Sequence, residues 1–146
     1  MFEFDLQVLL DARQANEEKT QMALAESLRE LGLQKELLND IRDRHLQMVT
    51  EYYALEGHPV ESFRLILYRE KIAEYHDQEM AQEERCRLAE EDVAKKRLAL
   101  IEAAKQRKIM ELLKEKKFLE YRQELSAKEI KELDEAAILR YEGEPS

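Results

Sequence analysis

The stretch Glu56-Gly57-His58-Pro59-Val60-Glu61 decides the fold of this chain. Gly57 tolerates the positive φ that is common where helices stop, and Pro59 cannot continue a helix. Pro59 also disfavours the α conformation at His58, and Ser62 is a suitable N-cap for a second helix. Apart from one proline near the C-terminus, Pro59 is the only proline in the chain. The stretch therefore predicts a tight corner between two helices.

Apolar residues recur on both sides of this corner at alternating steps of three and four, which is the spacing of a coiled coil. Before the corner they are Leu38, Ile41, His45, Met48, Tyr52 and Leu55. After it the same spacing runs through Leu65, Tyr68, Ile72, Tyr75, Glu79, Gln82, Cys86, Ala89, Val93, Lys96, Leu100, Ala103, Arg107 and Met110. We predict an all-α fold, a two-helix antiparallel coiled-coil hairpin with a long C-terminal overhang. It forms one domain over residues 1–146, with helices at about 2–55 and 62–141 and a corner at 56–61. The stripe changes phase between Leu31 and Leu38, which predicts an irregularity in the first helix.

The composition excludes several classes of protein. Charged residues make up 39% of the chain, with three glycines and no tryptophan, which is typical of a long helix or coiled coil. Such a fold has a narrow seam and no deep substrate pocket, so we expect a protein that is not an enzyme. The net charge of −9 argues against nucleic-acid binding. A single cysteine, Cys86, fits a reducing compartment, and no segment resembles a membrane span or a signal peptide, so we expect a cytoplasmic protein.

Titratable side chains give no sign of a metal, cofactor or catalytic site. The histidines His45, His58 and His76 lack the spacing of metal ligands, and no glycine-rich phosphate loop is present. Glutamate pairs such as Glu17-Glu18 are interpreted as a solvated helix face. We therefore expect no cofactor and no metal ion.

The second helix is predicted to be longer than the first and to extend beyond it. Folding at the corner places Phe2 near Glu115, so that the chain after about Phe118 has no partner from the first helix. An apolar stripe without an internal partner predicts one in another chain. The stripe comprises Phe118, Tyr121, Leu125, Ile130, Leu133, Ala137 and Ile138.

Charge is distributed unevenly along the chain. Residues 94–128 contain eleven basic and five acidic side chains, a net charge of +6. Residues 129–146 carry −4 and residues 1–93 carry −11. The two ends of the hairpin are therefore expected to attract different surfaces.

Four features together resemble the FliJ-type proteins of the bacterial flagellar type III export apparatus, and the resemblance covers the whole chain. They are the opening Phe2 to Arg13, the aromatic-rich bend on both sides of the corner, the Lys/Arg-rich stretch before Phe118, and the ending Lys131-Glu132-Leu133-Asp134-Glu135. The last of these, at its distance from a phenylalanine-rich start, is the most specific. The chain departs from the frequent basic N-terminus of that family, because its first basic residue is Arg13.

The resemblance implies a stalk-like coiled coil whose termini end inserts into the hexameric ring of the flagellar export ATPase. It also implies contact with the large membrane protein of the export gate, with export chaperones as further partners. The location implied is the cytoplasmic face of the inner membrane, and the expected free state is a monomer without nucleic acid and without direct membrane insertion.

Two groups of residues are the candidates for these contacts. The ring set comprises Phe2, Leu6, Lys114, Lys117, Phe118, Tyr121, Arg122, Leu125, Ile130, Leu133 and Asp134. The gate set near the corner is carried over as a patch and comprises Met48, Tyr52, Leu65, Tyr68, Ile72 and Tyr75.

Other functions stay open at this point. The same architecture fits the stalk of a virulence injectisome. The overhang stripes of two copies can also pair, which would make the protein an autonomous dimerising scaffold. A basic helical arm over Lys95–Lys128 that grips RNA is disfavoured by the overall charge and by the lack of a stacking platform.

Overall fold

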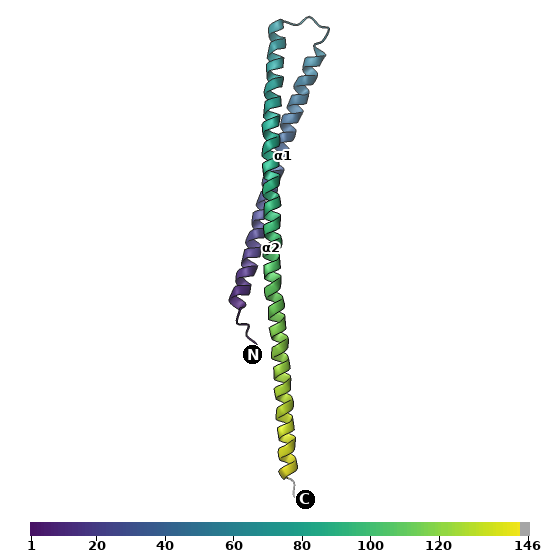
Figure 1. Ribbon diagram of the computed structural model, residues 1–146. Coiled ribbons are helices and arrows are strands. Elements are labelled where there is room, and N and C mark those ends of the chain that lie inside the picture. The colour runs from purple at the N-terminus through teal and green to yellow at the C-terminus, as the bar shows by residue number, and fades with distance from the viewer. Residues whose placement is uncertain (144–146) are drawn as a thin grey trace. The chain divides into compact units, whose positions relative to one another are not determined.

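A computed structural model describes residues 1–143 of the chain. It contains two long helices, α1 (Gln7–Ala54) and α2 (Ser62–Gly143), and no strand within that range. The chain divides into two compact units, one of Met1–Glu18 with Ile101–Ser146 and the other of Lys19–Leu100. In each unit a part of α1 lies antiparallel to a part of α2 (Figure 1). The prediction of an all-α antiparallel hairpin is thus confirmed, while a single domain over 1–146 stays a prediction.

The corner forms as a series of turns after Ala54. The amide of His58 donates to the carbonyl of Leu55 at 3.2 Å, and Gly57 adopts a φ of +79°. The amide of Leu65 donates to the carbonyl of Glu61 at 3.3 Å, so the N-cap position belongs to Glu61. Our assignment of Ser62 as the N-cap was wrong by one residue, because the carbonyl of Glu61 already accepts the first helical hydrogen bond.

The seam of α1 keeps one phase along its whole length. A line of half-buried and buried positions continues the steps of three and four without a break, at residues 10, 13, 17, 20, 24, 27, 31, 34, 38, 41, 45, 48 and 52, and residue 55 just after the helix continues it. The expected irregularity between Leu31 and Leu38 is absent, and α1 is one continuous helix. The apparent phase change arose because polar residues such as Ser27 and Gln34 occupy the seam, while apolar residues such as Leu28 lie on the exposed side.

The first six residues are not helical, although we predicted helix from about residue 2. The chain has no regular secondary structure from residue 1 to residue 4, turns at Asp5 and Leu6, and enters α1 at Gln7. In this N-terminal segment Phe2 and Phe4 are half-buried while Glu3 is exposed. Burial of alternate residues does not fit a helix, in which residues two positions apart lie on different faces.

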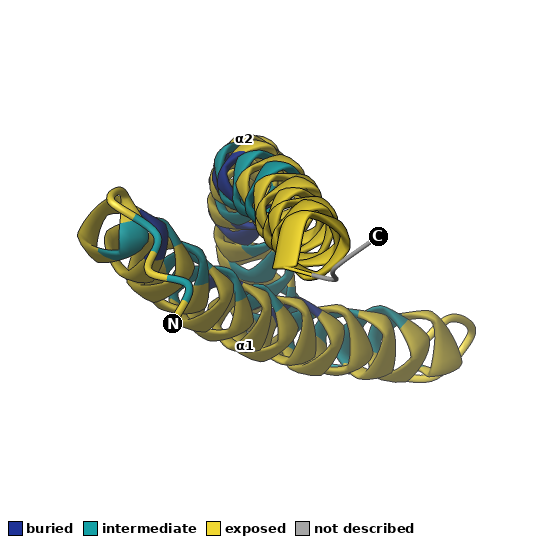
Figure 2. Cartoon of the chain, turned by 90° about the horizontal axis from the view of Figure 1, so that it is seen from below, coloured by how far each residue is buried: buried dark blue, intermediate teal, exposed yellow. Residues whose placement is uncertain are grey.

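Beyond the N-terminal segment, α2 continues without a neighbour. All residues from Arg122 to Gly143 are exposed, as the uniform colour of this end of α2 indicates (Figure 2). We call residues 122–143 the overhang. It spans about 33 Å at 1.5 Å per residue. The predicted overhang is therefore present, and it starts a few residues later than expected because Phe2 reaches Phe118 and Tyr121 rather than Glu115.

Candidate partner-binding surfaces

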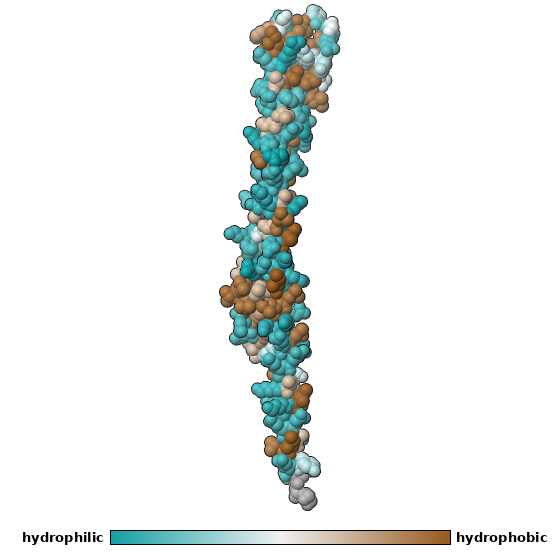
Figure 3. Space-filling view, in the orientation of Figure 1, coloured by the Kyte–Doolittle hydropathy of each residue, from teal (hydrophilic) through white to brown (hydrophobic). Residues whose placement is uncertain are grey.

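An aromatic cluster marks the base of the overhang. The ring of Phe2 lies edge-on to Phe118, with centroids 5.2 Å apart, and 5.5 Å from the ring of Tyr121. Leu6 and Lys117 line a shallow hollow beside Phe2 and Tyr121. Brown apolar atoms gather next to this cluster, beside the start of α1 (Figure 3). The structure thus brings together the ring-set residues at both ends of the sequence.

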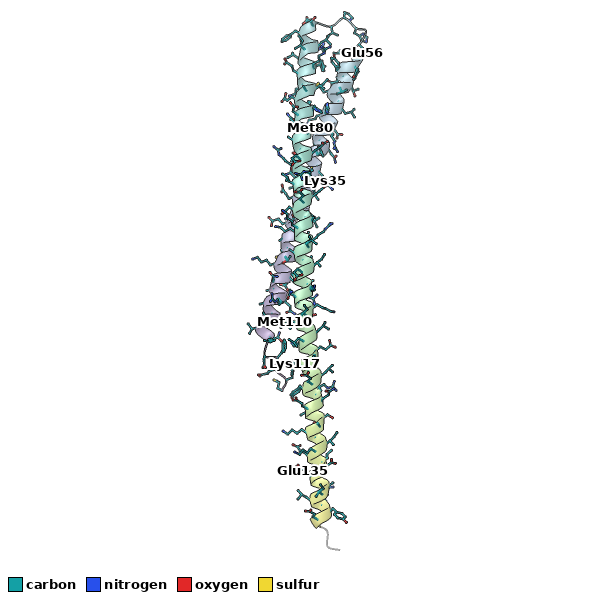
Figure 4. The ribbon with its side chains drawn as sticks, viewed as in Figure 1. Lys35, Glu56, Met80, Met110, Lys117 and Glu135 are labelled. Carbon is teal, nitrogen blue, oxygen red and sulfur yellow. The ribbon has the colours of Figure 1, made fainter. Side chains whose placement is uncertain are left out.

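Basic side chains surround this cluster. The guanidinium carbon of Arg122 lies 6.0 Å from the centroid of Phe118, and Lys117 forms an ion pair with Glu120 at 3.6 Å. Lys114 lines a second hollow together with Phe2 and Phe118. Lys117 is the labelled side chain next to the N-terminal segment (Figure 4). An aromatic centre with a cationic rim offers both apolar area and attraction to carboxylates.

The seam behind the cluster fixes its position. Leu10 is 3% exposed, and Ala103 and Met110 are also buried. Arg107 forms ion pairs with Glu17 of α1 and with Glu111 at 2.7 Å, the second being an i, i+4 pair. These contacts hold the start of α1 against α2 and therefore hold Phe2 near Phe118.

The remaining ring-set residues, Leu125, Ile130, Leu133 and Asp134, lie on the overhang. The exposed fraction is 43% for Leu125, 58% for Ile130 and 70% for Leu133, and Asp134 is also exposed. Residues that share a helix face are separated by three, four or seven positions. Leu125 therefore continues the line of Phe118, whereas Ile130 and Leu133 lie on a different line. The single stripe that we predicted was wrong, because Tyr121 faces Phe2 while Ile130 and Leu133 face away from α1.

The gate-set residues form the seam of the other unit near the corner. All six are half-buried between α1 and α2. The ring of Tyr52 lies 6.4 Å from Tyr68, and the hydroxyl of Tyr52 accepts a hydrogen bond of 2.9 Å from Nε of Arg69. The role that the structure gives these side chains is to hold the two helices together.

The exposed apolar surface of this end is made by different residues, which sequence reasoning missed. Phe63 is 68% exposed, Tyr53 60%, Ile66 51% and Leu67 48%. Phe63, Ile66 and Leu67 lie within one turn at the start of α2, and we call these three residues the corner patch. They could have been found as apolar residues that lie next to the seam positions Leu65 and Tyr68 but not on the seam, which therefore does not account for them.

Charged side chains bridge the helices between the corner and residue 34. Nδ1 of His45 donates to Glu79 at 2.8 Å, and Arg42 bonds to Glu79 at 3.1 Å and to Glu83 at 3.0 Å. The hydrogen bond from His45 is the main reason that the pKa of Glu79 lies below its ordinary value, and the bond from Arg42 lowers it further. Such bridges hold the helices in register.

Another polar pair lies further along the same seam. The hydroxyl of Ser27, which is buried, donates to the carboxylate of Asp92. This hydrogen bond is the main reason that the pKa of Asp92 lies below its ordinary value, and Lys96 at 3.7 Å adds a favourable charge. The pair stabilises the carboxylate in its ionised form.

Within residues 1–143 no three carboxylate, histidine or cysteine side chains come together as a metal site. No helix in the described range is long and apolar enough to cross a membrane. Cys86 is a buried thiol at a seam position, as its place in the heptad predicted.

Two of three comparisons with known proteins found a match. The family model described as the flagellar FliJ protein matches residues 2–146. A solved structure of a Chlamydia trachomatis protein, described as a YscO homologue, superposes with a TM-score of 0.72. It is 18% identical, and the match covers 97% of this chain and 96% of that chain, so it supports the fold. The search of curated proteins found no match.

Proposed function

The chain belongs to the flagellar FliJ protein family, and we propose that it is the stalk of a flagellar type III export ATPase. Membership of this family associates the chain with type III protein export. We propose that the stalk has no catalytic activity of its own. It promotes assembly and activity of the ATPase ring and links the ring to the export gate at the cytoplasmic face of the inner membrane.

The observation that carries this proposal is the overhang with the aromatic cluster at its base. An isolated helix of 22 residues that exposes Leu125, Ile130 and Leu133 gains little stability alone. A ring that encloses it would bury these side chains and leave Lys114, Lys117 and Arg122 to face acidic groups at its rim. Rim ion pairs of this kind contribute orientation and association rate more than affinity.

The gate contact is proposed for the other unit. The corner patch of Phe63, Ile66 and Leu67 offers exposed apolar area beside the half-buried gate set. Exposed side chains can meet a partner without opening the seam, so we place the contact on the patch and its rim rather than on Tyr52 or Tyr68. Export chaperones are proposed as further partners.

A crossed binding experiment tests both contacts. Leu125→Asp is expected to weaken binding to the export ATPase and to lower stimulation of ATP hydrolysis, while leaving binding to the cytoplasmic domain of the gate unchanged. Phe63→Asp is expected to do the reverse. Leu88→Asp is the matched control, because Leu88 is 51% exposed in the unit of Lys19–Leu100 and lies in neither surface. Unchanged ring binding by Leu125→Asp and by a chain cut before residue 125 would refute the stalk.

The stalk of a virulence injectisome is the second candidate, favoured by the fold shared with a YscO homologue. Deletion of the gene distinguishes the two. Loss of motility with intact effector secretion supports the flagellar stalk, and the opposite phenotype supports the injectisome.

A further inference from the structure

A second line of side chains, six of the nine apolar, runs along α2 on the side away from α1. It begins at Ile109 and continues in steps of three and four to Ala137. The line comprises Ile109, Leu112, Lys116, Leu119, Gln123, Ser126, Ile130, Leu133 and Ala137. We call it the outer seam.

The outer seam is exposed throughout and differs from the seam that contacts α1. The exposed fraction is 48% for Ile109, 53% for Leu112 and 51% for Leu119, all in the part of α2 that α1 accompanies. In that part the side chains that face α1 include Ala103 and Met110, which are buried. The heptad spacing of a coiled coil is thus present twice on one helix, and only one of the two lines is covered.

We propose that a second copy of this chain covers the outer seam, in the antiparallel orientation. The pairing is centred between Glu124 and Leu125. In this register Leu119 faces Ile130 of the second copy and Leu112 faces Ala137 of the second copy. The polar pair Gln123 and Ser126 meets at the centre, where it sets the register at a cost in stability.

Charge along α2 favours this arrangement. Residues 105–128 carry a net charge of +4, and residues 129–143 carry −3. Antiparallel pairing about residues 124–125 lays the basic segment of one copy along the acidic segment of the other. The charge pattern of α2 is therefore complementary to that of a second α2 in the antiparallel orientation.

The side chains that flank the outer seam give the same result in detail. In an antiparallel coiled coil the side chains at heptad position g, which directly precede the a positions of the seam, face one another across the interface. This places Arg122 opposite Glu129 of the second copy, and the pair occurs twice by symmetry. Neither of these side chains forms an ion pair within residues 1–143 of its own chain. A parallel dimer in register would instead place Glu115 beside Glu120 and Glu129 beside Asp134, which are like charges. The flanking charges therefore select the antiparallel form.

This self-association does not depend on the proposed stalk function. It would occupy Ile130 and Leu133, which belong to the ring set, so a paired chain and a ring-bound chain would be alternatives. The polar centre and the small Ala137 make the pairing weak. A monomer is therefore expected at low concentration and a dimer at high concentration.

A charge-swap series tests the proposal in the full chain. Sedimentation equilibrium from low micromolar to about 1 mM covers the range of a weak specific association. The unaltered protein is expected to dimerise. Glu129→Arg breaks two ion pairs and creates two repulsions, which is expected to raise the dissociation constant roughly tenfold. Combining it with Arg122→Glu restores attraction and is expected to return the constant to its original value. Glu135→Arg is the matched control, because it makes the same change of charge on the α1 side of the helix.

Orientation is tested by disulfide cross-linking in a Cys86→Ala background. A mixture of Gln123→Cys chains and Ser126→Cys chains is expected to cross-link between the two variants, whereas a parallel dimer would cross-link each variant to itself. Monomeric protein at about 1 mM would overturn the proposal. So would a dimer that Glu129→Arg does not weaken, or self-linked variants. If the protein stays monomeric and Ile130→Asp only weakens ATPase binding, the outer seam belongs to the ring instead.

Discussion

The buried glutamine pair between α1 and α2 allows a prediction whose sign is not obvious. Replacing both Gln34 and Gln82 by leucine is expected to raise the free energy of unfolding. Gln82 is 1% exposed, and its Nε2 donates to the carbonyl of Gln34 at 3.0 Å and to Oε1 of Gln34 at 2.6 Å. Each hydrogen bond contributes about 0.5–1.5 kcal/mol net, so losing both costs about 1–3 kcal/mol. The bonds from Arg85 to Gln82 (3.2 Å) and from Gln34 to Glu30 (2.8 Å) are also lost, but Arg85 and Glu30 are exposed, so water replaces these bonds at little net cost.

The leucines offset this loss by hydrophobic burial. A fully buried leucine contributes about 1.5–3 kcal/mol, and the half-buried position 34 gives about half of that, for a gain of about 2–4.5 kcal/mol. The difference is a stabilisation of about 1 kcal/mol, with no buried donor or acceptor left unpaired. Urea unfolding followed by far-UV circular dichroism is expected to show a midpoint higher by about 0.5 M, given the usual slope of about 1–3 kcal/mol per M.

The single variant Gln82→Ala is the control for this reasoning. It removes both hydrogen bonds and the packing of the side chain without replacing either, so a destabilisation of about 2–3 kcal/mol is expected. If the double-leucine variant proves less stable than the unaltered protein, the balance between hydrogen bonding and burial assigned to this seam is wrong.

Two further predictions concern the stability of each unit. In the unit of Lys19–Leu100 the pKa values of Glu79 and Asp92 are lower in the folded state than in the unfolded chain. The two carboxylates therefore contribute fully to the free energy of unfolding above the ordinary carboxylate pKa range, and this contribution is lost as the pH falls through their folded-state pKa values. Acid titration of the unfolding free energy is expected to flatten in a Glu79→Gln/Asp92→Asn variant, and an unchanged slope would contradict the assigned hydrogen bonds. In the other unit Leu10→Ala is expected to lower the free energy of unfolding by about 2 kcal/mol, which is the low end for buried leucines because a two-helix seam can close over the cavity. Leu9→Ala is the control and is expected to lower it much less, because Leu9 is 39% exposed. Hydrogen exchange of the amides in the first turns of α1 measures both, and equal effects would refute the seam assignment.

The fold could be predicted from the sequence because one short stretch and one periodicity determine it. Gly57 and Pro59 permit only a turn, and the line from Leu65 to Met110 is half-buried or buried at every predicted position. The start of α1 was misjudged because the apolar run from Phe2 was counted as part of the helix, although Phe2 and Phe4 are two positions apart and do not share a helix face. In the structure Phe2 packs against Phe118 instead.

The candidate surfaces were predicted less well, for a physical reason. Apolar residues in a coiled coil serve either the seam or a partner, and hydrophobicity alone does not separate the two uses. Tyr52 and Tyr68, which were proposed to bind a partner, also pack between the helices, and their role in binding stays a prediction. The exposed Phe63 was not singled out. Polar residues at seam positions, such as Ser27 and Gln34, also concealed the true phase of α1.

The antiparallel course of the helices has a consequence for the order of folding. The hydrogen bond from Arg69 to Tyr52 closes a loop of 17 residues, that of Gln82 with Gln34 closes 48, and that of Arg107 with Glu17 closes 90. The entropy of closing a loop rises with its length, but each contact shortens the loop that the next one must close. Pairing is therefore expected to start beside the corner and to proceed towards the termini. During synthesis the unit of Lys19–Leu100 can complete its contacts before residues 101–146 have emerged from the ribosome. The N-terminal segment can pack only after Phe118 has been synthesised.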